Sequence, residues 1–213
     1  MTSTPVVSQS TPIVLPELVT LAAALALASL VAVATPADAA TISIGVQRRG
    51  DRIDIEASAQ LDADGATAWR VLADYERYVD FIPDLRVSRV SARRGATVIV
   101  EQSGDATLWL LRLPLDVTFE ITEIAPTRLR SRAIAGSFPT LESDYRLTPT
   151  GSGVRLEYQG RVATGWALLG PLEQLAVERN IARQFQALAD AIEQRSAGDV
   201  TRRRIDAPNP RDD

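Results

Sequence analysis

The side chains of this chain that could take part in acid–base chemistry are its carboxylates, tyrosines, hydroxyls and arginines. The sequence contains no histidine, no cysteine and no lysine, so all 23 basic residues are arginines. Zinc sites of the usual kind, Ser-His-Asp and Cys-His nucleophiles, thiol redox chemistry and lysine Schiff bases are therefore excluded. We predict a protein without a metal or cofactor, and this composition fits a binding role better than catalysis.

The stretch "DYERYVDFIPDL", residues 74–85, contains the aromatic residues Tyr75, Tyr78 and Phe81. On an α-helix through this stretch, both tyrosines share one side with Val79, and Phe81 lies beside Tyr78. A tyrosine ring packs on apolar surface while its hydroxyl meets a polar group. The segment is predicted to be a short amphipathic lid, whose rings either pack on the core alone or also line the entrance to a ligand cavity.

A long helix predicted for Pro171–Arg195 carries a carboxylate within its apolar face. Glu178 falls inside the apolar stripe, where a carboxylate must be paired, hydrogen-bonded or protonated. It is interpreted either as an ion-pair partner of a rim arginine or as a group that binds a ligand or acts as an acid or base. Arg179, beside it, could hold an anionic head group. The stripe consists of Ile181, Ala182, Phe185, Leu188, Ala189 and Ile192.

The remaining candidates for ligand contacts are aromatic residues on predicted strands and turns. Trp109 lies on a strand that is apolar on both faces, which indicates either a sandwiched strand or contact with a partner or membrane surface. Phe119, Tyr145 and Tyr158 share the parity of strand-core residues, so they face the core or a cavity. Phe138 lies in "AGSFPT", either a loop at the cavity mouth or a hairpin turn with one core-facing ring.

The elements that must position these residues follow from periodicity. Apolar and polar residues alternate over 53–61, which predicts a half-buried strand, and residues 42–46 form an earlier strand. Asp64 is the predicted N-cap of a short helix that leads into residues 74–85. Short connectors after Pro83 predict antiparallel strands. These strands are 85–91, 97–103, 106–113, 116–124, 128–135, 141–147 and 153–163.

The two ends of the chain differ from the middle in composition. Residues 1–40 are predicted to be a signal peptide, because an uncharged apolar run over 18–34 precedes the small-x-small sequence Ala37-Asp38-Ala39. An uncleaved membrane anchor over 18–34 is the alternative. Residues 196–213 are predicted to be a disordered tail. The folded domain is therefore predicted to span 41–195 and to be exported, either periplasmic or secreted.

Three segments together resemble the START-like (SRPBCC) helix-grip superfamily, in its polyketide cyclase/dehydrase-type branch, whose relatives include ubiquinone-binding proteins. They are "ATAWRVLADYERYVDFIPDLRVSRV", the run of strands, and "ERNIARQFQALADAI", which cover about residues 52–195. The resemblance implies an α+β fold: a curved antiparallel sheet wrapped around a long C-terminal helix, with two short helices after the first main strand. It also implies a hydrophobic cavity between sheet and helix. It says little about function, because such folds host carriers, receptors and enzymes.

Our hypothesis is a protein that binds a hydrophobic small molecule, lipid or isoprenoid-like, between the sheet and the C-terminal helix. The alternative is a cyclase, dehydratase or hydrolase that uses Glu178 and a tyrosine without metal. A third option is a protein-interaction module, which a pocket below about 300 Å³ would favour. A formal net charge of −4 gives no reason to expect a nucleic-acid partner.

Overall fold

The computed structural model describes residues 41–108, 111–163 and 171–206. Within these ranges, eight antiparallel strands form one sheet in the order β1-β2-β8-β7-β6-β5-β4-β3. Every neighbouring pair except β2 and β8 is also consecutive in sequence, as short connectors require. The strands are β1 (Ile42–Arg49), β2 (Arg52–Leu61), β3 (Leu85–Arg94), β4 (Thr97–Leu108), β5 (Leu111–Ile124), β6 (Arg128–Gly136), β7 (Thr140–Thr150) and β8 (Gly153–Ala163).

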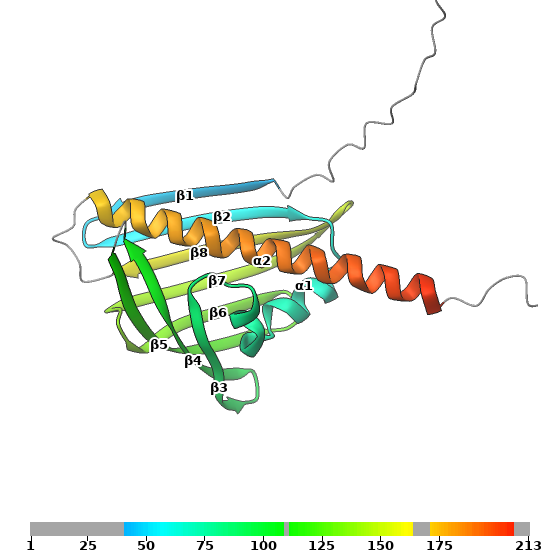
Figure 1. Ribbon diagram of the computed structural model, residues 1–213, viewed down its shortest axis with the longest axis horizontal. Helices are drawn as coiled ribbons and strands as arrows, with labels where there is room; N and C mark the ends of the chain where they lie inside the picture. The colour runs from blue at the N-terminus through cyan, green and yellow to red at the C-terminus, as the bar shows by residue number, and fades with distance from the viewer. Residues whose placement is uncertain (1–40, 109–110, 164–170, 207–213) are drawn as a thin grey trace, which may run out of the picture. The chain divides into compact units, whose positions relative to one another are not determined.

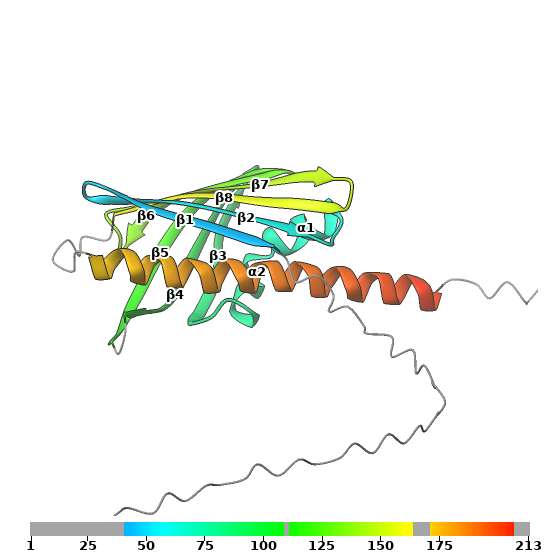
Figure 2. The same ribbon diagram turned by 90° about the horizontal axis from the view of Figure 1, so that it is seen from above.

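Three helices accompany the sheet in the described part of the chain. The short helix α1 (Gly65–Leu72) begins where the Asp64 carboxylate accepts a hydrogen bond from the Thr67 N–H at 2.7 Å. A 3₁₀-helix, η1 (Tyr75–Asp80), follows directly, and α2 (Pro171–Asp206) is the long C-terminal helix. Figures 1 and 2 show β1 and β2 running along α2, while β4 and β5 cross it steeply because the sheet curves around the helix. The predicted helix-grip α+β fold is confirmed.

The core lies where β2 and β8 meet α1 and the middle of α2. Alternate residues of the two strands are fully buried, because a strand points successive side chains to opposite faces. On α2 the apolar stripe is buried at Phe185, Leu188, Ala189 and Ile192, whereas Ile181 and Ala182 are half-buried. The largest fully buried side chains include Ile53, Ile55, Leu61, Leu72, Leu156 and Ile192.

Polar contacts fasten the first turn of α2 to the edge strand β1. The Glu173 carboxylate, whose side chain is 4% exposed, forms an ion pair with Arg48. Beside it, the Gln174 side-chain amide donates to the Val46 carbonyl at 3.2 Å. A buried carboxylate with an arginine partner keeps its charge compensated, so this end of the helix is fixed in position.

Two predicted boundaries were wrong. Residues 106–113 are not a separate strand: β4 runs on to Leu108, β5 begins at Leu111, and Asp105 pairs with Pro114. Pro114 is tolerated because β5 pairs with β6 only from Val117 onward, so at Pro114 it is an edge strand.

The C-terminal helix also ends later than predicted. Residues 196–206, which were assigned to a disordered tail, are helical and continue α2. Gly198 is tolerated inside a helix at a cost of about 1 kcal/mol, and an ion pair between Asp199 and Arg70 ties this turn to α1. Residues 1–40 and 207–213, including the predicted signal peptide, lie outside the described residues. No helix of the described part is long and apolar enough to cross a membrane.

A substitution of Gly153 tests the assigned conformation of the turn between β7 and β8. It has φ of +138°, and a Cβ there would lie 2.1 Å from the Leu61 carbonyl oxygen. Gly153→Ala should therefore lower the free energy of unfolding by at least about 2 kcal/mol in urea titrations, through strain and steric overlap. Gly151→Ala, in the same turn with open space around it, is the control and should change it by less than about 0.5 kcal/mol. Equal effects of the two substitutions would contradict the assigned register.

Candidate ligand-binding site

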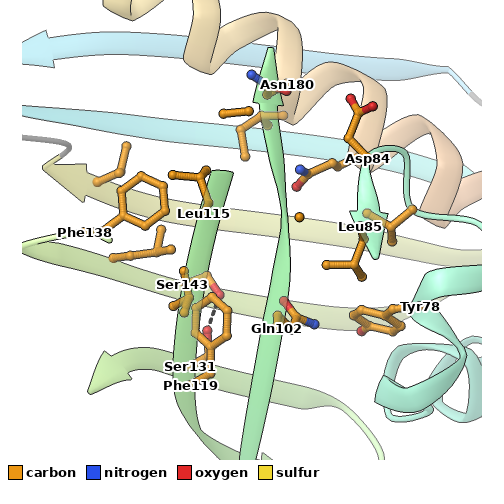
Figure 3. A pocket seen from close by; sticks show the side chains of 18 of the residues that line it. Tyr78, Asp84, Leu85, Gln102, Leu115, Phe119, Ser131, Phe138, Ser143 and Asn180 are labelled. Carbon is orange, nitrogen blue, oxygen red and sulfur yellow. Dashed lines mark hydrogen bonds between the residues drawn. The ribbon is translucent and has the colours of Figure 1, made fainter. Parts of the chain in front are cut away.

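A cavity of about 280 Å³ lies between the concave face of the sheet and the first half of α2. Its walls are mainly apolar, from strands β2, β5, β6, β7 and β8 and from one side of α2 (Figure 3). The volume falls just below about 300 Å³, the lower end of the range typical of small-molecule sites, so by size alone it favours the third option, a protein-interaction module. The arrangement of the polar and aromatic groups is more informative.

Six of the ten residues predicted to contact a ligand line this cavity: Tyr75, Tyr78, Phe119, Phe138, Tyr145 and Tyr158. All four tyrosines of the chain are among them. The other four do not contribute in the described structure. Phe81 packs against the core behind Tyr78, Glu178 and Arg179 are exposed, and Trp109 lies outside the described residues, as does the predicted membrane contact of its strand.

The helix type of the lid brings its two tyrosine rings together. In a 3₁₀-helix residues i and i+3 eclipse one another, so Tyr75 and Tyr78 lie on one side, and the C-cap residue Phe81 follows directly after the helix. The ring centroids of Tyr75 and Tyr78 lie 6.0 Å apart, and those of Tyr78 and Phe81 lie 5.5 Å apart. The prediction that Val79 shares this face was wrong, because it assumed an α-helix; Val79 is 38% exposed.

The hydroxyls of the two lid tyrosines are already engaged by the protein. Tyr75 donates to the Glu123 carboxylate at 2.9 Å, and Arg93 binds the other oxygen of that carboxylate at 2.9 Å. Tyr78 donates to the Leu72 carbonyl at 2.6 Å, which ties η1 to the end of α1. These bonds leave the rings, rather than the hydroxyls, to face the cavity.

A second aromatic group forms the floor. Tyr145 on β7 and Tyr158 on β8 pair across the strands with centroids 4.8 Å apart, and Tyr158 lies 6.4 Å from Phe185 on α2. The Tyr158 ring lies over Gly160, where a Cβ would come within 2.3 Å of the Tyr158 hydroxyl oxygen. Gly160 therefore gives the ring room to lie along the sheet.

Burial raises the pKa of all four tyrosines well above the ordinary value. For Tyr75 the hydrogen bond to Glu123 adds to the effect of burial, and for Tyr78 and Tyr158 the neighbouring Tyr145 adds to it. The phenols therefore stay neutral at physiological pH. They can donate or accept hydrogen bonds, but none is available as a phenolate base.

The neutral polar groups of the cavity come from the inner strands. Ser131 on β6 and Ser143 on β7 face each other directly, with their hydroxyl oxygens 2.7 Å apart, close to Phe119 (Figure 3). Gln102 on β4 donates to the Ser88 hydroxyl at 3.1 Å. Sequence reasoning missed these residues, although Ser131 alternates with the outward arginines Arg130 and Arg132 and so had to face inward.

Two carboxylates, each paired with an arginine, lie at the cavity mouth. Asp84 accepts a hydrogen bond from Arg183 of α2 at 2.8 Å, and Asp105 forms an ion pair with Arg86. Asp84 has φ of +63°, a conformation that aspartate tolerates better than most residues. A Cβ at Gly104 would lie 2.5 Å from its carbonyl oxygen, so a glycine is required opposite this turn. Both mouth carboxylates are thus neutralised by arginine.

Glu178 points to solvent because the side of α2 that faces the sheet changes along the helix. Over the cavity the facing residues are Val177, Asn180, Ile181 and Gln184, and Glu178 lies roughly 100° from the centre of that set. A single helical wheel assumes one facing direction, whereas α2 crosses a curved sheet. The expectation that Glu178 lies in the buried stripe was therefore wrong.

The sequence matches the family described as "Polyketide cyclase / dehydrase and lipid transport" over residues 52–196. The chain belongs to this family. The predicted START-like, polyketide cyclase-type resemblance is thereby confirmed. No curated protein matches the sequence.

Several solved structures share this family's fold with the chain. A STAR-related lipid transfer protein from Xanthomonas axonopodis has 17% identity and a TM-score of 0.60, with 76% of this chain and 97% of that one covered. The Zhui aromatase/cyclase from a Streptomyces species has 14% identity and a TM-score of 0.56, covering 70% and 96%. A START superfamily protein from Mycobacterium smegmatis has 16% identity and a TM-score of 0.53, covering 72% and 99%. Such low identities establish the fold alone.

The raised tyrosine pKa values can be tested by titrating the native protein. Because all four tyrosines line the cavity, the tyrosinate absorbance should stay absent well above pH 10, where the unfolded chain ionises. The folded state holds these protons more tightly, so their stabilising contribution is complete below about pH 10 and is lost as the pH rises further. Near-ultraviolet absorbance and circular dichroism should therefore change together. Tyrosinate formed near pH 10 in a still-folded protein would contradict this.

Proposed function

We propose that this protein binds a hydrophobic small molecule in the cavity between the sheet and α2 and acts as a carrier or binding protein. The observation that carries the proposal is the lining itself: apolar walls and aromatic rings surround a few neutral polar groups. This is the composition of sites that enclose an apolar ligand and orient it with few hydrogen bonds. The volume of about 280 Å³ favours a protein-interaction module, whereas the enclosed polar groups favour a ligand site, and the proposal rests on the second observation.

Catalysis by an acid–base pair has less support. The carboxylates that line the described cavity, Asp84 and Asp105, are each paired with an arginine, and Glu178 lies away from it. The tyrosines are held neutral by burial. A cyclase or dehydratase needs a group that can exchange a proton with its substrate. The solved relatives include both a lipid transfer protein and an aromatase/cyclase, and this lining favours the first role.

Substitutions of Ala176 and Ala197, two alanines of α2, test whether the cavity is the binding site. Ala176 lines the cavity, whereas Ala197 is exposed on the same helix. Ala176→Trp should fill the space and weaken binding of naphthalene more than about tenfold in equilibrium dialysis, because the volume it needs is occupied. Ala197→Trp should leave the affinity unchanged. Organic extraction of both proteins from their own host should recover an apolar ligand only with Ala197→Trp. Equal binding by both variants would overturn the proposed site.

We also propose that the protein is exported, on the basis of the uncharged run over 18–34 and the following Ala37-Asp38-Ala39. Fractionation of the native host should place it outside the cytoplasm, and N-terminal sequencing should begin near residue 40. Ala39→Leu should block processing, since the cleavage site requires small residues. A full-length protein in the membrane fraction would instead indicate the anchor, and a cytoplasmic protein would contradict export.

A further inference from the structure

The charge of the cavity lining limits what can enter it. Of the chain's 23 arginines, none is among the described residues that line the cavity. The charged groups of that lining are Asp84 and Asp105, and their arginine partners lie outside it. Segments 109–110 and 164–170, which the structure does not describe, contain no basic residue in the sequence. A negatively charged ligand would therefore find no cation in the described lining, and Arg183 and Arg86 next to it are already paired with Asp84 and Asp105.

An uncompensated charge is costly in such a place. Moving an ionised carboxylate from water into an apolar environment without a partner is strongly unfavourable. Because Arg183 and Arg86 are already paired with Asp84 and Asp105, they are not available as partners for an incoming anion. Arg179, which the sequence offered as a partner for an anionic head group, is exposed and does not line the cavity. The cavity therefore disfavours any ligand whose ionised head group, such as the carboxylate of a fatty acid or the phosphate of a phosphorylated lipid, would have to be enclosed.

The serine pair favours a neutral ligand that carries an oxygen atom. Each hydroxyl has one proton to donate, and the bond between Ser131 and Ser143 uses one of the two. Among the hydrogen bonds of the described residues, none uses the second proton. The pair and the Phe119 ring both line the cavity (Figure 3). A ligand oxygen that meets the pair would accept that proton, while the ligand's apolar body contacts the surrounding rings.

We propose that the cavity selects neutral, mainly apolar molecules that carry a hydroxyl or carbonyl oxygen, and that Ser131 and Ser143 bind this oxygen. This inference rests on the proposed binding function and specifies its ligand class. The cavity itself distinguishes the neutral oxygenated compound from both its anionic and its oxygen-free counterparts.

Three compounds of one shape test the proposal: naphthalene, naphthol and naphthoate. At about pH 7.5 naphthoate is ionised, because carboxyl groups have a pKa near 4, whereas naphthol is neutral. Equilibrium dialysis with the full chain should show naphthol bound about three- to tenfold more tightly than naphthalene, the gain from one hydrogen bond. Naphthoate should bind at least about a hundredfold more weakly than naphthol. Naphthoate binding as tightly as naphthol would overturn the proposal and leave the binding function standing. Binding of none of the three would overturn both.

Serine substitutions test whether Ser131 and Ser143 bind the ligand oxygen. The double variant Ser131→Ala with Ser143→Ala should bind naphthalene normally but lose the advantage of naphthol. Ser152→Ala, an exposed serine in the β7–β8 turn, is the control and should keep that advantage. If the double variant does not fold, judged by circular dichroism, Ser131→Val with Ser143→Val, which removes both hydroxyls but refills their volume, should show the same loss. A retained preference for naphthol in a folded variant that binds naphthalene would overturn the assignment of the serine pair.

Discussion

The structure depends on the way one long helix covers one curved sheet. The middle of α2 packs closely on β2, β8 and α1 through Phe185, Leu188 and Ile192. Its first turn is fastened to the edge strand β1 by the ion pair of Glu173 and Arg48. Because both regions are fixed, the segment between them spans the concave face without closing on it. The cavity lies under this span, so its existence follows from the packing of α2 on either side.

The lid segment is held in place by contacts of its aromatic rings and by hydrogen bonds of its tyrosine hydroxyls. The 3₁₀ geometry of η1 brings the Tyr75 and Tyr78 rings into contact, Phe81 contacts Tyr78, and hydrogen bonds to Glu123 and Leu72 fix the tyrosine hydroxyls. Glu123 lies on β5, so the lid is bound to the sheet as well as to α1. The Arg183–Asp84 contact then joins the loop after η1 to α2. Hydrogen bonds therefore join the lid to the end of α1 and to β5, and the loop after the lid to α2.

The distribution of charge has a simple form. Arginines and carboxylates pair on the outer face of the sheet, as Arg128 and Asp144 do. Burial alone would raise the pKa of Asp144, but the hydrogen bond and charge of Arg128 outweigh it and lower the pKa. Apart from Asp84 and Asp105, each paired with an arginine, the polar groups that line the described cavity are neutral. This separation is what gives the cavity a selective lining, because apolar walls reject charge and a few hydroxyls accept a single polar atom.

The sequence by itself determined the fold class and most of the aromatic lining. Period-two alternation fixed which residues of β2 and β8 face inward, and the missing histidine, cysteine and lysine excluded most catalytic chemistry. Alternation also indicated that Phe119, Tyr145 and Tyr158 face inward, because parity on a strand depends only on local backbone geometry. The family resemblance covered about residues 52–195, which leaves out β1 and the last turns of α2.

Only the tertiary structure decided which polar groups share the cavity. Ser131 and Ser143 meet because β6 and β7 pair in one register, and Asp84 meets Arg183 across 99 residues of sequence. Glu178 points outward because α2 crosses a curved surface, which a helical wheel does not represent. Local periodicity reports the direction of a side chain relative to its own element. The contacts that make a site depend on how separate elements are placed against one another, and those placements come from packing.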